Sequence, residues 1–163
     1  MIKVGVLTLS DKGSRGERED KSGQVIKEMV REIDGVVVKY EVIPDEYELI
    51  VKTLISWCDE EKLDLILTTG GTGLSPRDVT PEATKAVITR EVPGIPEAMR
   101  MASLAKTNRA MLTRAVAGTR GGTLIINLPG SPKGVRENLE VVLPVIPHAL
   151  EILQARGGEC GQP

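Results

Sequence analysis

The chain has 163 residues, of which 40% are hydrophobic, and this length suits one domain with a substantial core. Its formal net charge is −2, and only 2% of its residues are aromatic. Surfaces that bind nucleic acid are usually basic and often carry stacking aromatics, so we expect no nucleic-acid partner. No apolar run is long enough to span a membrane, and Met1 leads into a strand without a signal peptide. We therefore expect a cytoplasmic protein without a membrane span.

The hydrophobic pattern predicts strands that alternate with helices along the chain. Val25, Met29 and Ile33, for example, recur at helical spacing. The predicted strands are Ile2–Leu9, Val36–Ile43, Leu63–Thr69 and Thr123–Leu128. The predicted helices are Ser22–Ile33, Tyr47–Glu61, one beginning at Thr80, one from Pro96 to about Lys106, one from Ser131 to Leu143, and Pro144–Arg156 with a bend at Pro147.

Two short segments of the predicted pattern need separate description, the start of the helix at Thr80 and the stretch Met111–Ala117. Thr80 precedes Pro81 and Glu82, so we expect its hydroxyl at the N-cap of the helix that follows. Met111–Ala117 is compatible with either a helix or a strand.

Alternating strands and helices predict right-handed crossovers and a mainly parallel sheet with helices on both faces. The core is aliphatic, which suits such a sheet, and Trp57 is expected inside it. We expect a single domain at residues 1–156 and a flexible tail at residues 157–163.

Polar or glycine-rich loops follow four of the predicted strands, and in a parallel sheet these loops open at one edge. Neighbouring strands are about 4.8 Å apart, so such loops can share one site. The loop Gly70–Gly73 has three glycines in four residues, which bares backbone N–H groups for phosphate oxygens. The alternative is a tight connection without a ligand. The loop is neither a dinucleotide fingerprint nor a P-loop, because the required third glycine and Gly-Lys-Ser/Thr are missing.

Asp45 and Asp78 lie just after predicted strands, in loops expected to converge. Two such carboxylates can hold Mg²⁺, directly or through water, while phosphates supply the remaining ligands. The alternatives are an N-cap for Asp45 and a turn residue for Asp78.

Other polar residues have plainer interpretations. Asp11 and Asp20 flank a charged loop that is expected to be solvated, and Ser131 is expected at an N-cap. Lys133 is a first-turn surface residue that can also reach an anion. His148 is the single histidine and lies in the last predicted helix, so we assign it a structural role and expect no histidine general base.

The loops together resemble the molybdopterin adenylyltransferase family of the Mog type, which is related to the G domains of plant and animal molybdenum-cofactor proteins. The resemblance extends from Val4 to about Leu153. Its most specific parts are Thr68–Gly73 (TTGGTG) and Arg77–Thr84 (RDVTPEAT). It also includes Leu9–Asp11, Glu19–Gly23, Ile43–Glu46, Glu91–Gly94, Glu97–Arg100 and Asn127–Lys133.

The resemblance implies an α/β/α sandwich, a homotrimer, and transfer of AMP from ATP with Mg²⁺ to molybdopterin, with pyrophosphate released. It implies that Asp45 and Asp78 are the catalytic and metal-holding acids. The residues expected to bind the pterin phosphate and the nucleotide are Ser10, Asp11, Ser22, Gly23, Thr69, Gly70, Gly71, Thr72, Gly73, Ser75, Asn127, Pro129, Gly130, Ser131 and Lys133. Contacts with other molybdenum-cofactor enzymes are also expected.

Three other functions compete with this one. The related molybdate-insertion step usually belongs to longer chains with a different glycine loop. A non-catalytic module that binds molybdopterin or docks a partner would release no pyrophosphate. A nucleotide-dependent oxidoreductase is disfavoured by the missing fingerprint.

Overall fold

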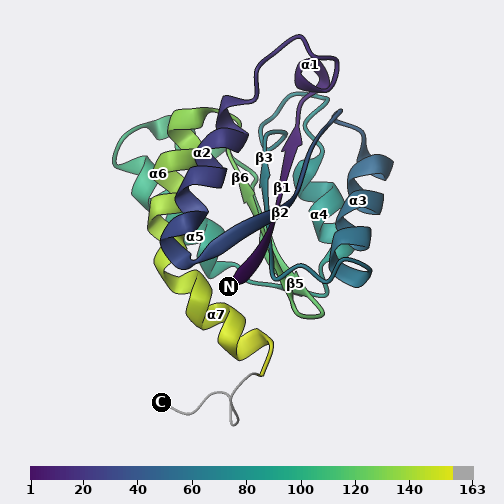
Figure 1. The fold of residues 1–163 in the computed structure, drawn as a ribbon. Helices are drawn as coiled ribbons and strands as arrows, with labels where there is room; N and C mark the ends of the chain where they lie inside the picture. Colours follow the sequence, from purple (N-terminus) through teal and green to yellow (C-terminus); the bar gives the residue numbers. More distant parts are fainter. Residues whose placement is uncertain (156–163) are drawn as a thin grey trace.

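The computed structural model describes residues 1–155, and in this part of the chain the strands form one six-stranded sheet (Figure 1). The order across the sheet is β2-β1-β3-β6-β5-β4. The strands β2, β1, β3 and β6 are parallel, whereas β5 is antiparallel to both β6 and β4. The strands are β1 Ile2–Leu9, β2 Gly35–Ile43, β3 Leu65–Thr69, β4 Arg90–Glu91, β5 Ala117–Arg120 and β6 Thr123–Leu128.

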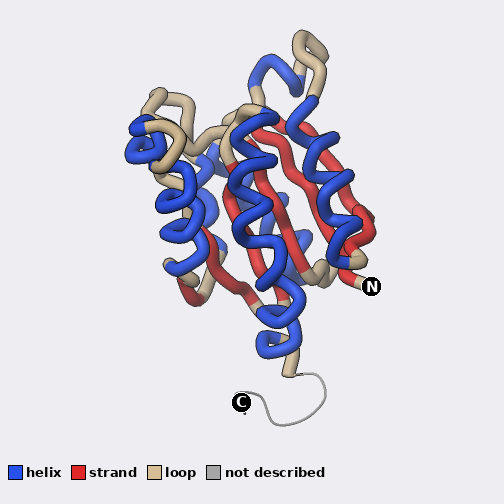
Figure 2. Tube along the Cα trace, turned by 90° about the vertical axis from the view of Figure 1, so that its left-hand side faces the viewer, coloured by secondary structure: helices blue, strands red, loops and turns tan. Residues whose placement is uncertain are grey.

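Helices cover both faces of the sheet, which confirms the predicted three-layer α/β/α arrangement (Figures 1 and 2). The helices α2, α5, α6 and α7 lie on one face, and α3 and α4 lie on the other. The α-helices are α1 Asp11–Ser14, α2 Lys21–Met29, α3 Tyr47–Asp59, α4 Thr80–Val87, α5 Gly94–Leu104, α6 Pro132–Val142 and α7 Ile146–Leu153. Short 3₁₀ helices occupy η1 Val30–Ile33, η2 Asn108–Leu112 and η3 Leu143–Val145.

Each face of the sheet carries its own hydrophobic cluster. Val4 and Val6 point to one face with Leu65 and Leu67, while Leu7 and Ile66 point to the other. Central parallel strands are buried on both faces, which explains their nearly continuous aliphatic sequences. Trp57 belongs to the second cluster, as predicted, and is 3% exposed.

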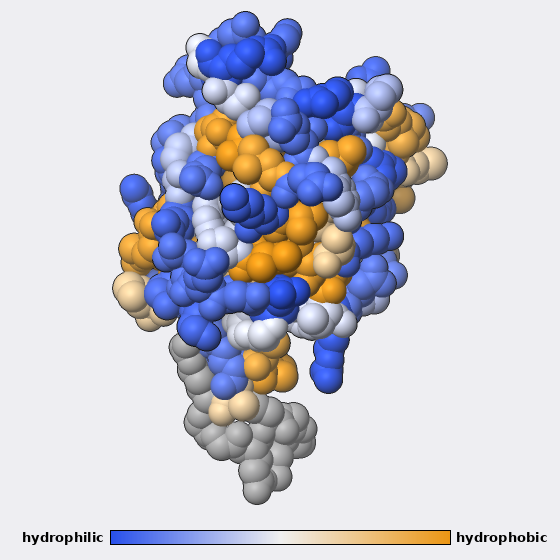
Figure 3. Space-filling view, turned by 90° about the vertical axis from the view of Figure 1, so that its right-hand side faces the viewer, coloured by the Kyte–Doolittle hydropathy of each residue, from blue (hydrophilic) through white to orange (hydrophobic). Residues whose placement is uncertain are grey.

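The face formed by α3 and α4 is apolar at its centre and hydrophilic around it (Figure 3). Val51, Ile55 and Ile88 are partly buried there and pack against the second cluster. In the part of the chain that the structure describes, none of the helices has the length and apolar character needed to cross a membrane.

The predicted elements are present, with ends that differ by a few residues. The predicted helix Ser22–Ile33 is α2 followed by the 3₁₀ turn η1, and the last helix begins with η3. The ambiguous segment Met111–Ala117 is mainly neither helix nor strand: η2 ends at Leu112, an extended stretch follows, and β5 begins at Ala117. The predicted tail, together with Arg156, lies outside the described residues.

The predicted elements omitted α1, β4 and β5. The strands β5 and β6 form a hairpin in which Arg120 pairs with Thr123, so that Gly121 and Gly122 are its two turn residues. Gly121 has a φ of 57°, which glycine adopts without strain. A two-residue glycine turn is a strong hairpin signal, and it brings β5 back antiparallel to β6.

Asn127 joins β6 to its surroundings from a fully buried position. Its amide nitrogen donates to the hydroxyls of Thr68, at 2.9 Å, and Thr84, at 3.0 Å. Its side-chain oxygen accepts the Val116 N–H at 3.1 Å. These bonds tie β3, α4 and the stretch before β5 to one side chain.

We predict that Asn127→Leu lowers the free energy of unfolding by about 1–3 kcal/mol, because it leaves the Val116 N–H without its acceptor. Urea unfolding followed by circular dichroism measures this change. Asn108→Leu, at an exposed position in η2, serves as the control and should change stability by less than about 0.5 kcal/mol. Equal stability of the two variants would contradict the assigned role of Asn127.

Candidate functional site

A cavity of about 940 Å³ lies at the carboxyl ends of the parallel strands, at the upper end of the molecule in Figure 1. The loops after β1, β2, β3 and β6 all contribute to it, as the sequence predicts. The predicted site residues that line it are Ser10, Asp11, Ser22, Asp45, Thr69, Gly70, Gly71, Ser75, Asp78, Gly130 and Ser131.

Six predicted site residues do not line this cavity. Asn127 faces the core, and Pro129 contributes its carbonyl oxygen as acceptor for the Thr69 hydroxyl at 2.6 Å. The Lys133 side chain is 87% exposed and lies 4.0 Å from Glu137.

The other three residues outside the lining are Gly23, Thr72 and Gly73, and each forms a backbone hydrogen bond to a side chain or backbone group of the protein. The Gly23 N–H donates to the Asp20 carboxylate at 3.0 Å. The carbonyl oxygens of Thr72 and Gly73 accept hydrogen bonds from Arg114.

Gly70 and Gly71 have backbone angles that other residues rarely adopt, with φ of 96° and 70°. A Cβ on Gly70 would lie 2.4 Å from the Leu9 carbonyl oxygen, and one on Gly71 would lie 2.3 Å from the Thr80 hydroxyl. The Gly70 N–H donates to the Leu128 carbonyl at 3.2 Å and is therefore not free for a ligand. Within residues 1–155, the Gly71 and Gly73 N–H groups have no protein acceptor. The glycine loop thus offers fewer free amides than its composition indicates.

The prediction that Thr80 caps α4 is wrong. Val79 occupies the N-cap position, and the Thr80 hydroxyl donates to the Gly70 carbonyl at 3.0 Å. The Thr80 N–H donates to the Gly71 carbonyl at 3.1 Å. The hydroxyl is drawn away from the helix end because the positive φ angles of the glycines turn their carbonyls toward it.

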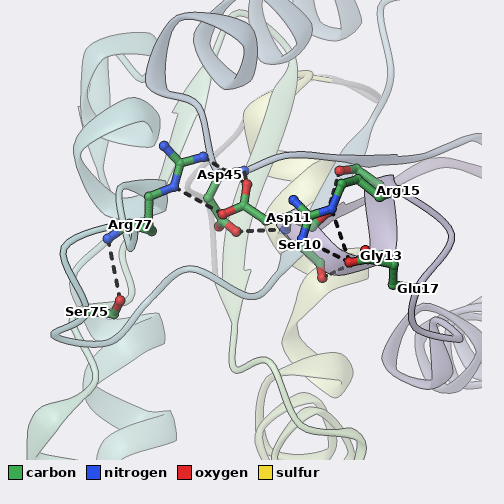
Figure 4. A network of polar contacts seen from close by, with 9 residues as sticks. Ser10, Asp11, Gly13, Arg15, Glu17, Asp45, Ser75 and Arg77 are labelled. Carbon is green, nitrogen blue, oxygen red and sulfur yellow. Dashed lines mark hydrogen bonds and ion pairs between the residues drawn. The ribbon is translucent and has the colours of Figure 1, made fainter.

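Asp11 and Asp45 form a reciprocal pair of hydrogen bonds, in which the carboxylate of each residue accepts the backbone N–H of the other (Figure 4). The Asp45 N–H donates to the Asp11 carboxylate at 3.0 Å, and the Asp11 N–H donates to the Asp45 carboxylate at 3.2 Å. Arg77 reaches across the cavity and donates two hydrogen bonds to Asp11, at 2.8 and 3.1 Å. The bonds from Arg77 and from the Asp45 backbone lower the pKa of Asp11. Asp11 therefore forms a partly exposed ion pair at the cavity, a role that its sequence context did not indicate.

Asp45 is the least satisfied acid of the site. Its Oδ1 atom is buried and has no hydrogen-bond partner in the described part of the chain. Burial raises the pKa of Asp45, and the negative charges of Asp11 and Asp78 add to this effect. Glu46 occupies the N-cap position of α3, so the alternative role of Asp45 as a helix cap is excluded. A buried carboxylate oxygen without a donor is suited to a cation.

Asp78 is a turn residue at the wall of the cavity, which is the alternative considered for it, and its metal role stays a prediction. Its carboxylate accepts the Ser75 N–H at 3.0 Å and closes a turn, and the residue also lines the cavity. In the described part of the chain, no group of three His, Cys, Asp or Glu residues could hold a metal ion. Two carboxylates alone supply too few ligands for Mg²⁺, so its remaining ligands would have to be phosphate or water oxygens.

The helices α2 and α6 begin at the cavity. Ser22 lies in the first turn of α2, and its hydroxyl donates to the Gly130 carbonyl at 2.7 Å. Ser131 caps α6 by accepting the Gly134 N–H at 3.0 Å, which confirms its predicted N-cap role. Helix N-termini favour anions, so this pair of helices adds positive potential to the cavity.

Sequence reasoning missed the cations of the site and one structural acid. Lys12, Arg18, Lys21 and Arg77 line the cavity. Arg77 and Lys21 lie inside stretches that carry the family resemblance, but Lys12 and Arg18 stand in a charged loop with no distinguishing pattern. Asp20 also lines the cavity, where it caps α2 and accepts the hydroxyls of Thr8 and Tyr40; these partners could be found only from the fold.

We predict that Gly71→Ala destabilises the protein by about 1–3 kcal/mol, because its Cβ would collide with Thr80 and approach Asp45 at a positive φ. Gly94→Ala is the matched control, since a Cβ there meets nothing within 4 Å. Denaturant unfolding of the two variants makes the comparison. A Gly71→Ala protein as stable as the control would disprove the assigned backbone constraint.

Relatives of this chain are known among characterised proteins. The chain is 49% identical to the molybdopterin adenylyltransferase of Helicobacter pylori strain J99 over 93% of its own length and 88% of the relative. It is 43% identical to the molybdopterin adenylyltransferase of Escherichia coli K12, over 86% of its own length and 73% of the relative.

A solved structure and a family model agree with these relatives. The molybdopterin biosynthesis enzyme MoaB from Thermus thermophilus superimposes with a TM-score of 0.91, is 56% identical, and covers 98% of this chain and 100% of that one. Residues 5–148 match a family model described as a probable molybdopterin binding domain. The chain therefore belongs to the family of probable molybdopterin-binding domains.

Proposed function

We propose that the chain transfers adenylate from Mg-ATP to the phosphate of molybdopterin, giving adenylylated molybdopterin and pyrophosphate. The observation that carries the proposal is the cavity in which the unpartnered oxygen of Asp45 lies beside the glycine loop and is accompanied by several cations. Relatives named molybdopterin adenylyltransferase, 49% and 43% identical to this chain, support the same reaction.

In this reaction a phosphate oxygen of molybdopterin attacks the α-phosphorus of ATP. A new P–O bond forms, and the bond between the α-phosphorus and the bridging oxygen breaks as pyrophosphate leaves. The nucleophile is already an anion, so the reaction needs no strong general base. This fits a cavity whose lining contains neither histidine nor cysteine among the described residues. The main requirements are the close positioning of two phosphates and the reduction of their mutual repulsion.

The cavity meets both requirements with its own groups. Lys12, Arg18 and Lys21 line it and supply positive charge to phosphate oxygens. The N-termini of α2 and α6 add backbone dipoles. The Gly71 N–H is available as a further donor because Gly71 has no side chain to keep a phosphate away.

We assign Asp45 and Asp78 to the Mg²⁺ that arrives with ATP, directly or through water. The buried, unpartnered Oδ1 of Asp45 supports this assignment, since it lacks the hydrogen bond that a buried carboxylate normally has. The ion would neutralise charge on the phosphates. Asp11 contributes less to this ion, because Arg77 already balances its charge.

Incubation with molybdopterin and Mg-ATP, followed by mass spectrometry, tests the function. The expected products are adenylylated molybdopterin and pyrophosphate. Bound molybdopterin without pyrophosphate would instead indicate a binding or docking module. A product that requires molybdate would indicate the molybdate-insertion step.

We predict that Asp45→Asn lowers the turnover number by about 100-fold or more, because it removes the charge assigned to the metal while keeping the side-chain shape. Steady-state pyrophosphate release measures the effect, and thermal unfolding checks that the fold is kept. Glu46→Gln is the matched control, since Glu46 is exposed and outside the cavity lining. Near-normal turnover of Asp45→Asn would refute the metal role.

We also propose the homotrimer that the family resemblance implies. Its support in this chain is the exposed apolar surface of α5 and η2, where Met101 and Met111 are 74% and 69% exposed. Light scattering on the purified protein should give three times the mass of one chain, and a monomer mass would contradict the proposal. A cytoplasmic location and contacts with other molybdenum-cofactor enzymes stay predictions.

A further inference from the structure

The loop that carries Asp78 is held from behind by one arginine, Arg114. Its Nε donates to the Gly73 carbonyl at 2.8 Å, and its Nη2 donates to the Asp78 carbonyl at 2.8 Å. The remaining nitrogen, Nη1, pairs with the Glu82 carboxylate in the first turn of α4. One planar guanidinium thus bonds to three points along residues 73–82 through a fixed fork of donors that a lysine ammonium does not have.

Arg114 does not belong to the cavity itself. It lines a separate hollow of about 450 Å³ with residues of α4 and α5 and is absent from the lining of the main cavity. It therefore acts on the Asp78 loop from outside the main cavity, where substrates are not expected.

Arg114 is itself fixed by its neighbours. Its own N–H donates to the Thr72 carbonyl at 2.9 Å. Arg100 of α5 donates to the carbonyls of Thr113, at 3.1 Å, and Ala115, at 2.9 Å, which flank Arg114 in sequence. A rigid support thus extends from α5 through Arg114 to the glycine loop.

The loop needs this support because its other bonds are mostly local. Residues 74–77 are exposed. Two hydrogen bonds close the turn: the Asp78 N–H donates to the Ser75 carbonyl, and the Ser75 N–H donates to the Asp78 carboxylate. The bond from Arg77 to Asp11 ties the loop to the other side of the cavity through an exposed ion pair. Exposed ion pairs contribute little rigidity, so Arg114 is the stronger anchor.

We propose that Arg114 is a positioning residue for the adenylyl transfer, because it holds the Gly73 and Asp78 carbonyls and so fixes the direction of the Asp78 carboxylate. This inference rests on the proposed function of the site. Small displacements of a group that acts on the reacting phosphates cost large factors in rate, so a looser loop lowers turnover.

Arg114→Lys tests the proposal because it keeps the charge next to Glu82 but loses the two separate nitrogens that bond to the two carbonyls. At saturating substrates its turnover number should fall about tenfold, with KM values within about threefold of the unmodified protein. Arg90→Lys is the matched control, since Arg90 is exposed, lies outside both cavities and is not part of the α5–η2 surface proposed for the trimer. Glu82→Gln keeps both carbonyl bonds and should retain most of the turnover. A normal turnover number in Arg114→Lys would overturn the proposal.

A double-mutant cycle separates positioning from a general loss of folded protein. If Arg114 acts through Asp78, Arg114→Lys should add less than about threefold to the turnover loss of Asp78→Asn. Losses that multiply would overturn the proposal, because the two residues would then act independently.

Amide hydrogen exchange of residues 73–78 provides a readout that does not depend on activity. Exchange in this loop should be at least tenfold faster in Arg114→Lys than in the unmodified protein, and unchanged in Arg90→Lys. Unchanged exchange would overturn the proposed anchor even if turnover fell. An unmodified protein that forms no adenylylated product would refute the function, whereas faster loop exchange in Arg114→Lys would still establish the anchor.

Discussion

Parallel pairing of β2, β1, β3 and β6 is the constraint on which the rest of this molecule depends. It places the ends of four strands at one edge, and each strand delivers a different loop there. Both faces of these strands are covered by helices, so the loops at the edge are the part of the sheet left open to a ligand. The cavity is therefore a consequence of topology, and the loop residues decide its chemistry.

Within the cavity, unfavourable local features are concentrated where phosphate chemistry is proposed. In the described part of the chain a buried oxygen of Asp45 has no donor, and burial together with the Asp11 and Asp78 charges raises the pKa of Asp45. These features of Asp45 cost folding free energy, which the two hydrophobic clusters offset, whereas Gly70 and Gly71 adopt their positive φ angles without strain. The Mg²⁺ proposed to arrive with ATP would supply the missing partner of this Asp45 oxygen.

Arginines hold this edge together from two sides. Arg77 pairs with Asp11 across the cavity, and Arg114 holds the same loop from behind through backbone carbonyls. The exposed pair can open when a ligand arrives, because solvent screens it. The two bonds of Arg114 to the Gly73 and Asp78 carbonyls are to neutral groups in a partly buried setting and are less sensitive to salt. The Asp78 loop is thus bound weakly to Asp11 through Arg77 and more firmly to Arg114 through its backbone carbonyls.

The sequence by itself determined the main strands, the helix order, the convergence of the loops, and Asp45, Asp78 and the glycine loop as the candidate site. These follow from local periodicity and from strand direction, which the chain carries in short segments. Only the tertiary structure decided that Asp11 pairs with Arg77, 66 residues away, that Asn127 faces the core, and that Arg114 anchors the loop. Periodicity cannot assign a face to a strand that is buried on both sides, and nothing local indicates which distant carbonyl an arginine will reach.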